Sequence, residues 1–190
     1  QLWFRNTWSW GRDDRRPSLR LVDADDTLAP GTTVIQAEHG WLGRYVLVAE
    51  GAPDVLFCDN ETNVAAVFGP DAGASLSAYP KDGIGRAVVD GDDSGTNPAA
   101  TGTKVGLVYR FESVAPGETV RVQLRLRADH QVERPFGRSF AAVLEDRSRE
   151  ADEFYDTVIP SDVSDEDRHV CRRAFAGLNW GKQLYRYSVK

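Results

Sequence analysis

The spacing of apolar residues changes from two to about 3.6 near residue 135, and this change divides the sequence in two. Before it, every second residue from Val120 to Leu126 is aliphatic, and the residues between them are arginine or glutamine. Such alternation is typical of a β-strand with one buried face and one solvent-facing face. We therefore expect the aliphatic residues of this run to be buried, and Arg121 and Arg125 to face solvent.

The segment from Leu2 to about Arg127 is predicted to form antiparallel sheet. Runs of β-branched or aliphatic residues bounded by Gly, Pro and Asp predict strands at residues 32–36, 43–49, 55–58 and 104–114. Pro116 and Gly117 suit the central positions of a type II turn, which predicts a hairpin between residues 105–111 and the Val120 run. Residues 83–86 are expected to be a plain turn, because no helical pattern follows them. Strands without intervening helices favour an antiparallel β-sandwich over a βαβ sheet.

Two helices are predicted after Pro135. Apolar residues recur at helical spacing from Phe140 to Tyr155, which predicts a helix over residues 138–157 with Glu145 and Arg149 paired on its surface. Ser164 followed by Asp167 resembles a capping box and predicts a second helix over residues 164–187. The second helix has an apolar stripe without a following partner helix. The sequence also contains no methionine, so we expect it to be a piece of a longer protein.

Composition excludes several classes of protein. The chain has 190 residues, which fits a single domain, and 41% of them are hydrophobic, which is enough for a packed core. Its 29 acidic and 23 basic residues argue against a nucleic-acid partner. No apolar run approaches the roughly 20 residues of a membrane-spanning helix, and no secretory signal is visible. Cys58 and Cys171 are expected to be buried free thiols in a reducing cytoplasm, with a single long-range bridge as the alternative.

Signatures of catalysis and metal binding are missing from the sequence. It contains no phosphate-binding loop, no nucleophile elbow and no zinc-binding helix motif. Residues 90–95 resemble the start of a calcium loop, but Thr101 stands where that loop has a bidentate glutamate, so a solvated turn is expected. We therefore assign no catalytic residue, no metal ligand and no cofactor.

Aromatic residues are the most distinctive part of the composition. Trp3, Trp8, Trp10 and Trp41 have the ring faces that stack on sugars, although large aromatic side chains more often occupy the core, which we favour here. The polar stretch Asn60-Glu61-Thr62-Asn63 lies between apolar runs. A hydrogen-bonded loop end is its expected role, with a ligand or partner contact as the alternative.

Several motifs together resemble a known family. Leu2-Trp3-Phe4-Arg5-Asn6-Thr7-Trp8-Ser9-Trp10-Gly11 resembles a strand of the bacterial members of glycoside hydrolase family 63, the processing α-glucosidase and mannosylglycerate hydrolase-like group. The resemblance continues, in the same order, through residues 60–63, 102–104, 135–137, 150–155 and 176–183. Cys58 and residues 81–85 depart from the family pattern.

The resemblance implies a place within a larger enzyme. Family members pair an N-terminal β-sandwich with a C-terminal (α/α)6 toroid, so residues 1–134 would be the later part of the sandwich, 135–160 a linker helix and 161–190 the first toroid helix. The family hydrolyses α-linked glucosides or mannosylglycerate-like sugars by an inverting mechanism that uses two carboxylates. Both would lie in the toroid beyond Lys190, where the sugar substrate binds, so no residue of this chain inherits a catalytic role.

The first motif is the expected point of contact with the toroid. Arg5, Asn6, Trp8 and Trp10 combine aromatic and polar groups beside a charged loop, and such groups need partners when they are buried. We expect them at the sandwich–toroid interface or beside the sugar site. Two alternatives are a free-standing carbohydrate-binding module and a purely structural β-sandwich; neither explains an amphipathic helix over residues 164–187.

Overall fold

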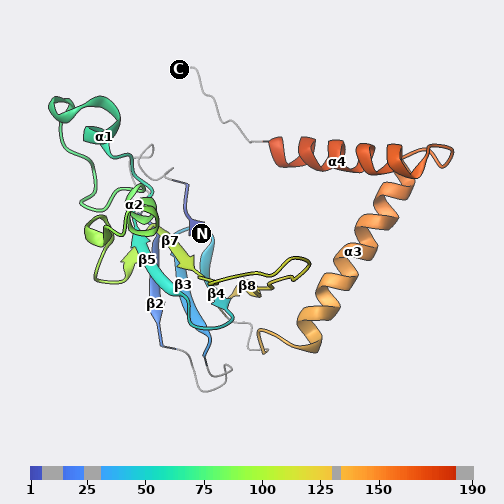
Figure 1. The fold of residues 1–190 in the computed structure, drawn as a ribbon, viewed down its shortest axis with the longest axis horizontal. Coiled ribbons are helices and arrows are strands. Elements are labelled where there is room, and N and C mark those ends of the chain that lie inside the picture. Colours follow the sequence, from blue (N-terminus) through green and yellow to red (C-terminus); the bar gives the residue numbers. More distant parts are fainter. Residues whose placement is uncertain (6–14, 24–30, 130–133, 183–190) are drawn as a thin grey trace. The chain divides into compact units, whose positions relative to one another are not determined.

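A computed structural model describes residues 1–5, 15–23, 31–129 and 134–182 (Figure 1). The chain forms two compact units, Gln1–Phe136 and Gly137–Lys190. The first unit contains the sheets and the second contains two helices.

The first unit is built from two antiparallel sheets. The three-stranded sheet has the order β1 (Leu2–Trp3), β7 (Lys104–Val108), β5 (Asp54–Cys58). The five-stranded sheet has the order β6 (Thr101–Gly102), β2 (Ser18–Val22), β3 (Thr33–His39), β4 (Gly43–Ala49), β8 (Leu124–Ala128). Every pairing between these strands is antiparallel. The predicted mainly-β, sandwich-like fold followed by two helices is confirmed.

The core lies between the two sheets. Leu19, Ile35 and Leu47 contribute from the five-stranded sheet, and Phe57 and Val105 from the three-stranded sheet. All five are buried. Their burial removes apolar surface from water, which supplies most of the free energy that holds the two sheets together.

Short helices between β5 and β6 were not expected from the sequence. They are α1 (Val64–Phe68), η2 (Pro70–Ala72), α2 (Gly83–Val89) and η3 (Asp93–Gly95). The predicted plain turn at residues 83–86 was therefore wrong, because these residues begin α2. A helix of seven residues is too short to show a clear period and depends on tertiary packing, here of the buried Ile84.

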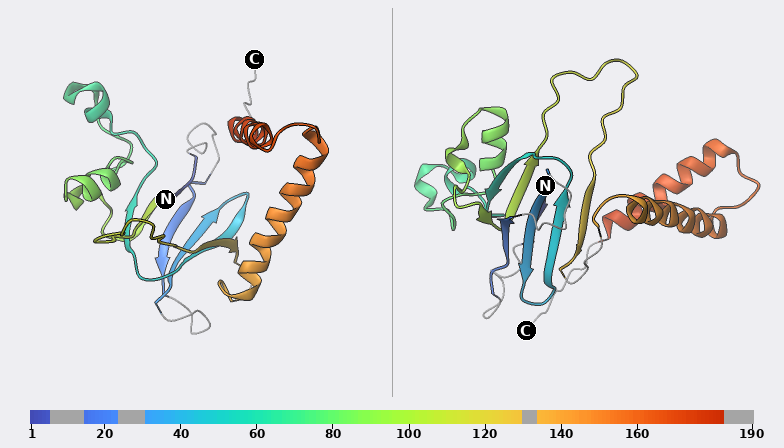
Figure 2. Two further views of the ribbon diagram at one scale, coloured as in Figure 1. Left: turned by 45° about the vertical axis from the view of Figure 1, so that its right-hand side comes forward. Right: turned by 90° about the horizontal axis from the view of Figure 1, so that it is seen from below.

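The predicted hairpin between residues 105–111 and the Val120 run does not form. β7 pairs with β1 and β5, whereas β8 pairs with β4 in the other sheet. The turn itself exists, since the N–H of Glu118 donates to the carbonyl of Ala115 at 3.0 Å. Residues 109–123 instead carry the chain from one sheet to the other, as the long connection in the right-hand view of Figure 2 shows. The alternating pattern identified a strand but contained no information about its partner.

The predicted burial of the Val120 run was also wrong. Val120, Val122, Leu124 and Leu126, here called the β8 stripe, are 36–53% exposed. Leu124 and Leu126 lie opposite the buried Ala49 and Leu47, so they belong to the inner face of the five-stranded sheet. The three-stranded sheet, as described, is too narrow to cover the β8 edge of the five-stranded sheet. Arg121 is exposed as expected, but Arg125 is partly buried.

The second unit contains α3 (Arg138–Val158) and α4 (Asp165–Gly181), which confirms both predicted helices. The Oγ of Ser164 accepts a hydrogen bond from the N–H of Asp167 at 3.1 Å, which is the expected N-cap. Arg149 pairs with Asp146 and Glu153 instead of the predicted Glu145. Residues 183–187 of the second predicted helix lie outside the described ranges.

Two ion pairs join α3 to α4. Arg168 contacts Asp156 at 2.8 Å, and Arg172 contacts Asp152 at 2.6 Å. The guanidinium of Arg172 also lies 4.8 Å from the centre of the Tyr155 ring. Of the helices that the structure describes, none has the length and apolar character needed to cross a lipid bilayer.

Candidate functional site

Of the four residues predicted at an interface or sugar site, the structure describes one. Arg5 follows β1 and is exposed. Asn6, Trp8 and Trp10 lie outside the described residues. Of the four tryptophans expected in the core, the structure describes Trp3 and Trp41, and the expectation was wrong for both: Trp3 is 53% exposed and Trp41 82% exposed.

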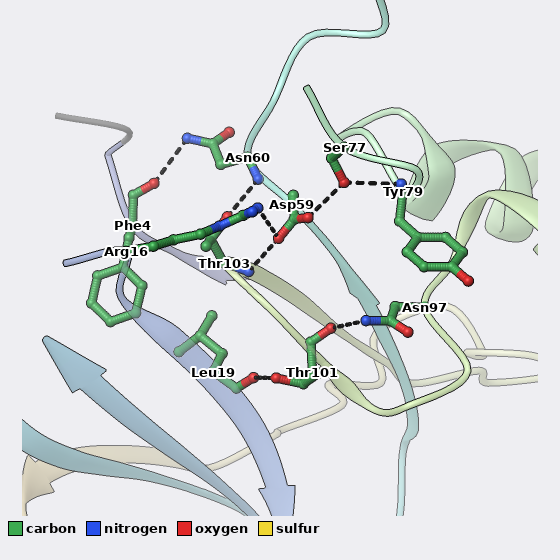
Figure 3. A network of polar contacts seen from close by, with 10 residues as sticks. All are labelled: Phe4, Arg16, Leu19, Asp59, Asn60, Ser77, Tyr79, Asn97, Thr101 and Thr103. Atoms are coloured by element: carbon green, nitrogen blue, oxygen red, sulfur yellow. Dashed lines mark hydrogen bonds and ion pairs between the residues drawn. The ribbon is translucent and has the colours of Figure 1, made fainter. Parts of the chain in front are cut away.

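A cluster of polar side chains surrounds Asp59, directly after β5 (Figure 3). Its Oδ1 accepts a hydrogen bond from the N–H of Thr103 at 3.1 Å and lies 2.6 Å from Nη2 of Arg16. Its Oδ2 accepts from the Oγ of Ser77 at 2.5 Å. We call these residues, with Asn60 and Tyr79, the Asp59 network. The Asp59 carboxylate is mostly shielded from solvent, so these charge-assisted bonds are stronger than exposed ones.

The Asp59 network also holds β1 in place. The backbone N–H of Asn60 donates to the Oγ1 of Thr103 at 2.8 Å, while the Asn60 Nδ2 donates to the carbonyl of Phe4 at 2.9 Å. The N–H of Phe4 donates to the carbonyl of Thr103 at 3.0 Å. Asn60, Phe4 and Thr103 come from three separate sequence motifs, and the fold brings them into direct contact.

A second polar group adjoins this network, where the loop after β5 meets the start of α2. The Asn63 Nδ2 donates to Oδ2 of Asp82 at 2.9 Å, and the Lys81 Nζ donates to Oγ1 of Thr62 at 3.2 Å. The N–H of Lys81 donates to the carbonyl of Glu61 at 2.9 Å, and Glu61 is 7% exposed. The stretch of residues 60–63 is thus a hydrogen-bonded loop end, as expected.

Close backbone packing fixes α2 beside β5. A Cβ placed on Gly83 would lie 2.0 Å from the carbonyl oxygen of Gly95 and 2.9 Å from Sγ of Cys58. The Cys58 thiol is buried, donates to the carbonyl of Gly95 at 3.3 Å, and has a pKa raised by burial. Cys58 is a free thiol with a structural role, since its thiolate is disfavoured at neutral pH.

Residues 90–95 form the predicted turn around Asp92, the N-cap of η3. The Asp92 carboxylate accepts from the Oγ of Ser94 at 2.6 Å and from its N–H at 3.0 Å, and it pairs with Arg86. These donors, the Ser94 hydroxyl first, lower the pKa of Asp92 from 3.8 to about 2.

This lowered pKa predicts an acid-dependent loss of stability. The charged Asp92 stabilises the folded state above pH 3.8, and this contribution is lost as the pH falls towards about 2. We expect Asp92→Asn to be less stable than wild type in urea unfolding at pH 7, with the difference disappearing at about pH 2. Asp71→Asn, which removes a charge from an exposed position, serves as the control. A difference of equal size at both pH values would contradict the prediction.

The Asp59 network is suited to positioning, and its carboxylate is already engaged by the protein's own donors. Within the described ranges, no group of three or more His, Cys, Asp or Glu residues is arranged to hold a metal ion. No pattern in the sequence pointed to Arg16 or Ser77. Thr103 and Asn60 were within the motifs singled out from the sequence, but their contact joins residues 43 positions apart.

Comparison with known proteins finds a similar yeast protein. The chain is 31% identical, over 217 aligned residues, to an uncharacterized protein of Saccharomyces cerevisiae, YMR196W. The alignment covers 99% of this chain and 19% of the yeast protein, so the chain spans about a fifth of the length of that relative. No family model matches the chain. No solved structure matches it either.

Proposed function

We propose that the chain is a non-catalytic portion of a cytoplasmic glycoside hydrolase similar to family 63. The whole enzyme would hydrolyse α-glycosidic bonds of glucosides or mannosylglycerate-like sugars with inversion. The β-sandwich unit would support a toroidal catalytic domain, and α4 would be the first helix of that domain.

The observation that carries this proposal is the contact between residues of three motifs on which the family resemblance rests. Phe4, Asn60 and Thr103 belong to the first, second and third of these motifs, and hydrogen bonds join them directly. Chance matches scattered along a sequence have no reason to meet in space. Their convergence supports the interpretation of the motifs as one structural element.

The order of the elements gives further support. A β-sandwich followed by paired helices is the order that the resemblance implies. The yeast relative is about five times as long as the region it shares with this chain, which leaves room for a separate catalytic domain.

Catalysis would depend on residues outside this chain. An inverting glycosidase holds a general acid and a general base roughly 6.5–9.5 Å apart, with a water molecule beside the base. The Asp59 carboxylate is engaged by Thr103, Ser77 and Arg16, which leaves it poorly placed to activate water. Its proposed role is to keep β1 and the following motif in position.

The test compares the 190-residue chain with the longer polypeptide that contains it. Both are incubated with α-glucosides and with mannosylglycerate, and released sugar is measured. We expect release by the longer polypeptide and none by the 190-residue chain. Turnover by the shorter chain that disappears when one of its own carboxylates is changed to an amide would overturn the placement of the active site. Absence of release by the longer polypeptide on every substrate would count against the glycosidase itself.

A carbohydrate-binding module is the second candidate, favoured by the exposure of Trp3 and Trp41. Exposed indole rings can stack on the apolar faces of pyranoses. Sugar binding that is lost in Trp41→Ala, with no hydrolysis by the longer polypeptide, would favour this candidate over the enzyme.

A further inference from the structure

An apolar groove lies between β1 and the β4–β8 edge of the five-stranded sheet. It has a volume of about 280 Å³. It is lined by Leu2, Trp3, Phe4, Ala37, His39, Leu42, Gly43, Tyr45 and Leu126. We call it the β1–β8 groove. The lining is almost wholly apolar, which suits aliphatic or aromatic side chains better than a sugar.

The groove exists because the two sheets differ in width. At one side, β5 lies against β6, since a Cβ on Gly102 would be 2.2 Å from the carbonyl oxygen of Cys58. At the other side, β1 lies over β3, where the Phe4 and His39 rings are 5.6 Å apart. In the described part of the chain the three-stranded sheet ends at β1, while the five-stranded sheet continues through β4 to β8. A strand placed next to β1 would therefore lie over β4, with β8 beside it.

The outer edge of β1 is available for strand pairing. β1 pairs with β7 on one side and is the edge strand of its sheet among the described residues. The N–H of Phe4 points to β7, where it donates to the carbonyl of Thr103 at 3.0 Å. Successive N–H groups of an extended strand point to opposite sides, so the N–H of Trp3 points away from β7. Unpaired edge groups of this kind bind an incoming strand.

We propose that the β1–β8 groove receives an additional β-strand, which pairs with the outer edge of β1, lies over β4 and places large apolar side chains against Tyr45 and Leu126. The strands that would lie beneath it, β4 and β8, have seven and five residues, so they match an added strand of similar length. A helix would leave the edge of β1 unpaired.

We commit to one occupant, a strand from the longer polypeptide. This inference rests on the proposed function, because the strand must come from a polypeptide that extends beyond this chain. The yeast relative has about four-fifths of its length outside the shared region, which can supply such a strand. A second copy of this chain is the alternative occupant, and concentration-dependent labelling distinguishes it.

Thiol labelling tests the coverage of the groove. Leu126→Cys is made with Cys171→Ser, so that the buried Cys58 is the remaining native thiol. We expect fast labelling in the 190-residue chain and labelling at least about tenfold slower in the longer polypeptide, because a paired strand must open first. Val89→Cys, at an exposed position on α2, should react equally in both.

Amide hydrogen exchange identifies the occupant as a strand. The Trp3 N–H should exchange rapidly in the shorter chain and slowly in the longer polypeptide. Protection of the thiol in the Leu126→Cys variant without protection of the Trp3 amide would overturn strand pairing. Equal labelling in both proteins, or slow labelling of the shorter chain that depends on its concentration, would overturn the proposed occupant. Sugar release is measured separately, so a failure of the glycosidase proposal and a failure of the strand proposal give different results.

Discussion

Replacing Gly83 with alanine is expected to lower the free energy of unfolding by about 3 kcal/mol. The new methyl group would be 2.0 Å from the carbonyl oxygen of Gly95 and 2.9 Å from Sγ of Cys58. Neither neighbour can move easily. Gly95 ends η3, which Asp92 caps, and Cys58 belongs to β5. Relief of the clash requires α2 to move away from the sheet, which would also disturb the packing of Ile84 against Gly106.

Gly85 provides the matched control in the same helix. A Cβ at Gly85 would meet nothing within 4 Å. Alanine is favoured over glycine in a helix by up to about 1 kcal/mol, so Gly85→Ala should leave stability unchanged or raise it. Urea unfolding of both variants, followed by tryptophan fluorescence, measures the difference. Equal stability of the two variants would show that α2 is not held at the position described.

Replacing Asp59 with alanine is expected to lower the free energy of unfolding by about 2–3 kcal/mol. The change removes acceptors from the N–H of Thr103 and from the Ser77 hydroxyl, and it leaves Arg16 without its ion pair. The N–H of Thr103 keeps a second acceptor, the carbonyl of Cys58 at 3.1 Å, but Thr103 is 1% exposed, so water cannot readily replace the lost carboxylate. Because Thr103 also bonds to Phe4, faster hydrogen exchange of the Phe4 amide should accompany the loss of stability.

Asp54 is the matched control for Asp59, since it begins the strand that Asp59 follows and also pairs with an arginine. Asp54 and Arg110 are both largely exposed, and exposed ion pairs contribute about 1 kcal/mol or less. Asp54→Ala should therefore change the unfolding free energy by less than about 1 kcal/mol. A loss for Asp59→Ala no larger than that for Asp54→Ala would mean that the Asp59 network does not stabilise the fold.

Local patterns in the sequence were sufficient to locate most of the regular elements. The predicted strand at residues 43–49 coincides with β4, and the predicted helix at 138–157 differs from α3 by one residue at its end. The start of α4 was predicted from Ser164 because a helix cap depends on residues three positions apart. Information of this kind lies within a few neighbouring residues.

Pairing and burial depended on contacts that local patterns do not encode. The alternation from Val120 to Leu126 was interpreted as half of a hairpin, yet β8 pairs with β4, about 80 residues earlier. Its aliphatic residues do face inward, but the described part of the opposite sheet ends at β1. Whether a side chain is buried depends on both sheets, whereas the sequence of one strand carries information about its own sheet alone.

The candidate site was predicted in the same partial way. The stretch of residues 60–63 drew attention because it is polar between apolar runs, and Asn60 indeed belongs to the Asp59 network. Asp59 itself showed no distinguishing signal, because its importance comes from Thr103 and Arg16, which are distant in sequence. The interface role of Arg5, Asn6, Trp8 and Trp10 stays a prediction.

The pairing of β1 with β7 also has a consequence for the order in which the chain folds. Leu2 pairs with Val105, so β1 must wait for this partner, which is made about one hundred residues later. At about 5–20 residues per second, the ribosome needs about 5–20 s to cover that distance. During this time Leu2, Trp3 and Phe4 lack their β7 partner, and unpaired apolar strands are prone to aggregate. β1 is therefore a segment whose delayed pairing would favour binding by a chaperone during synthesis.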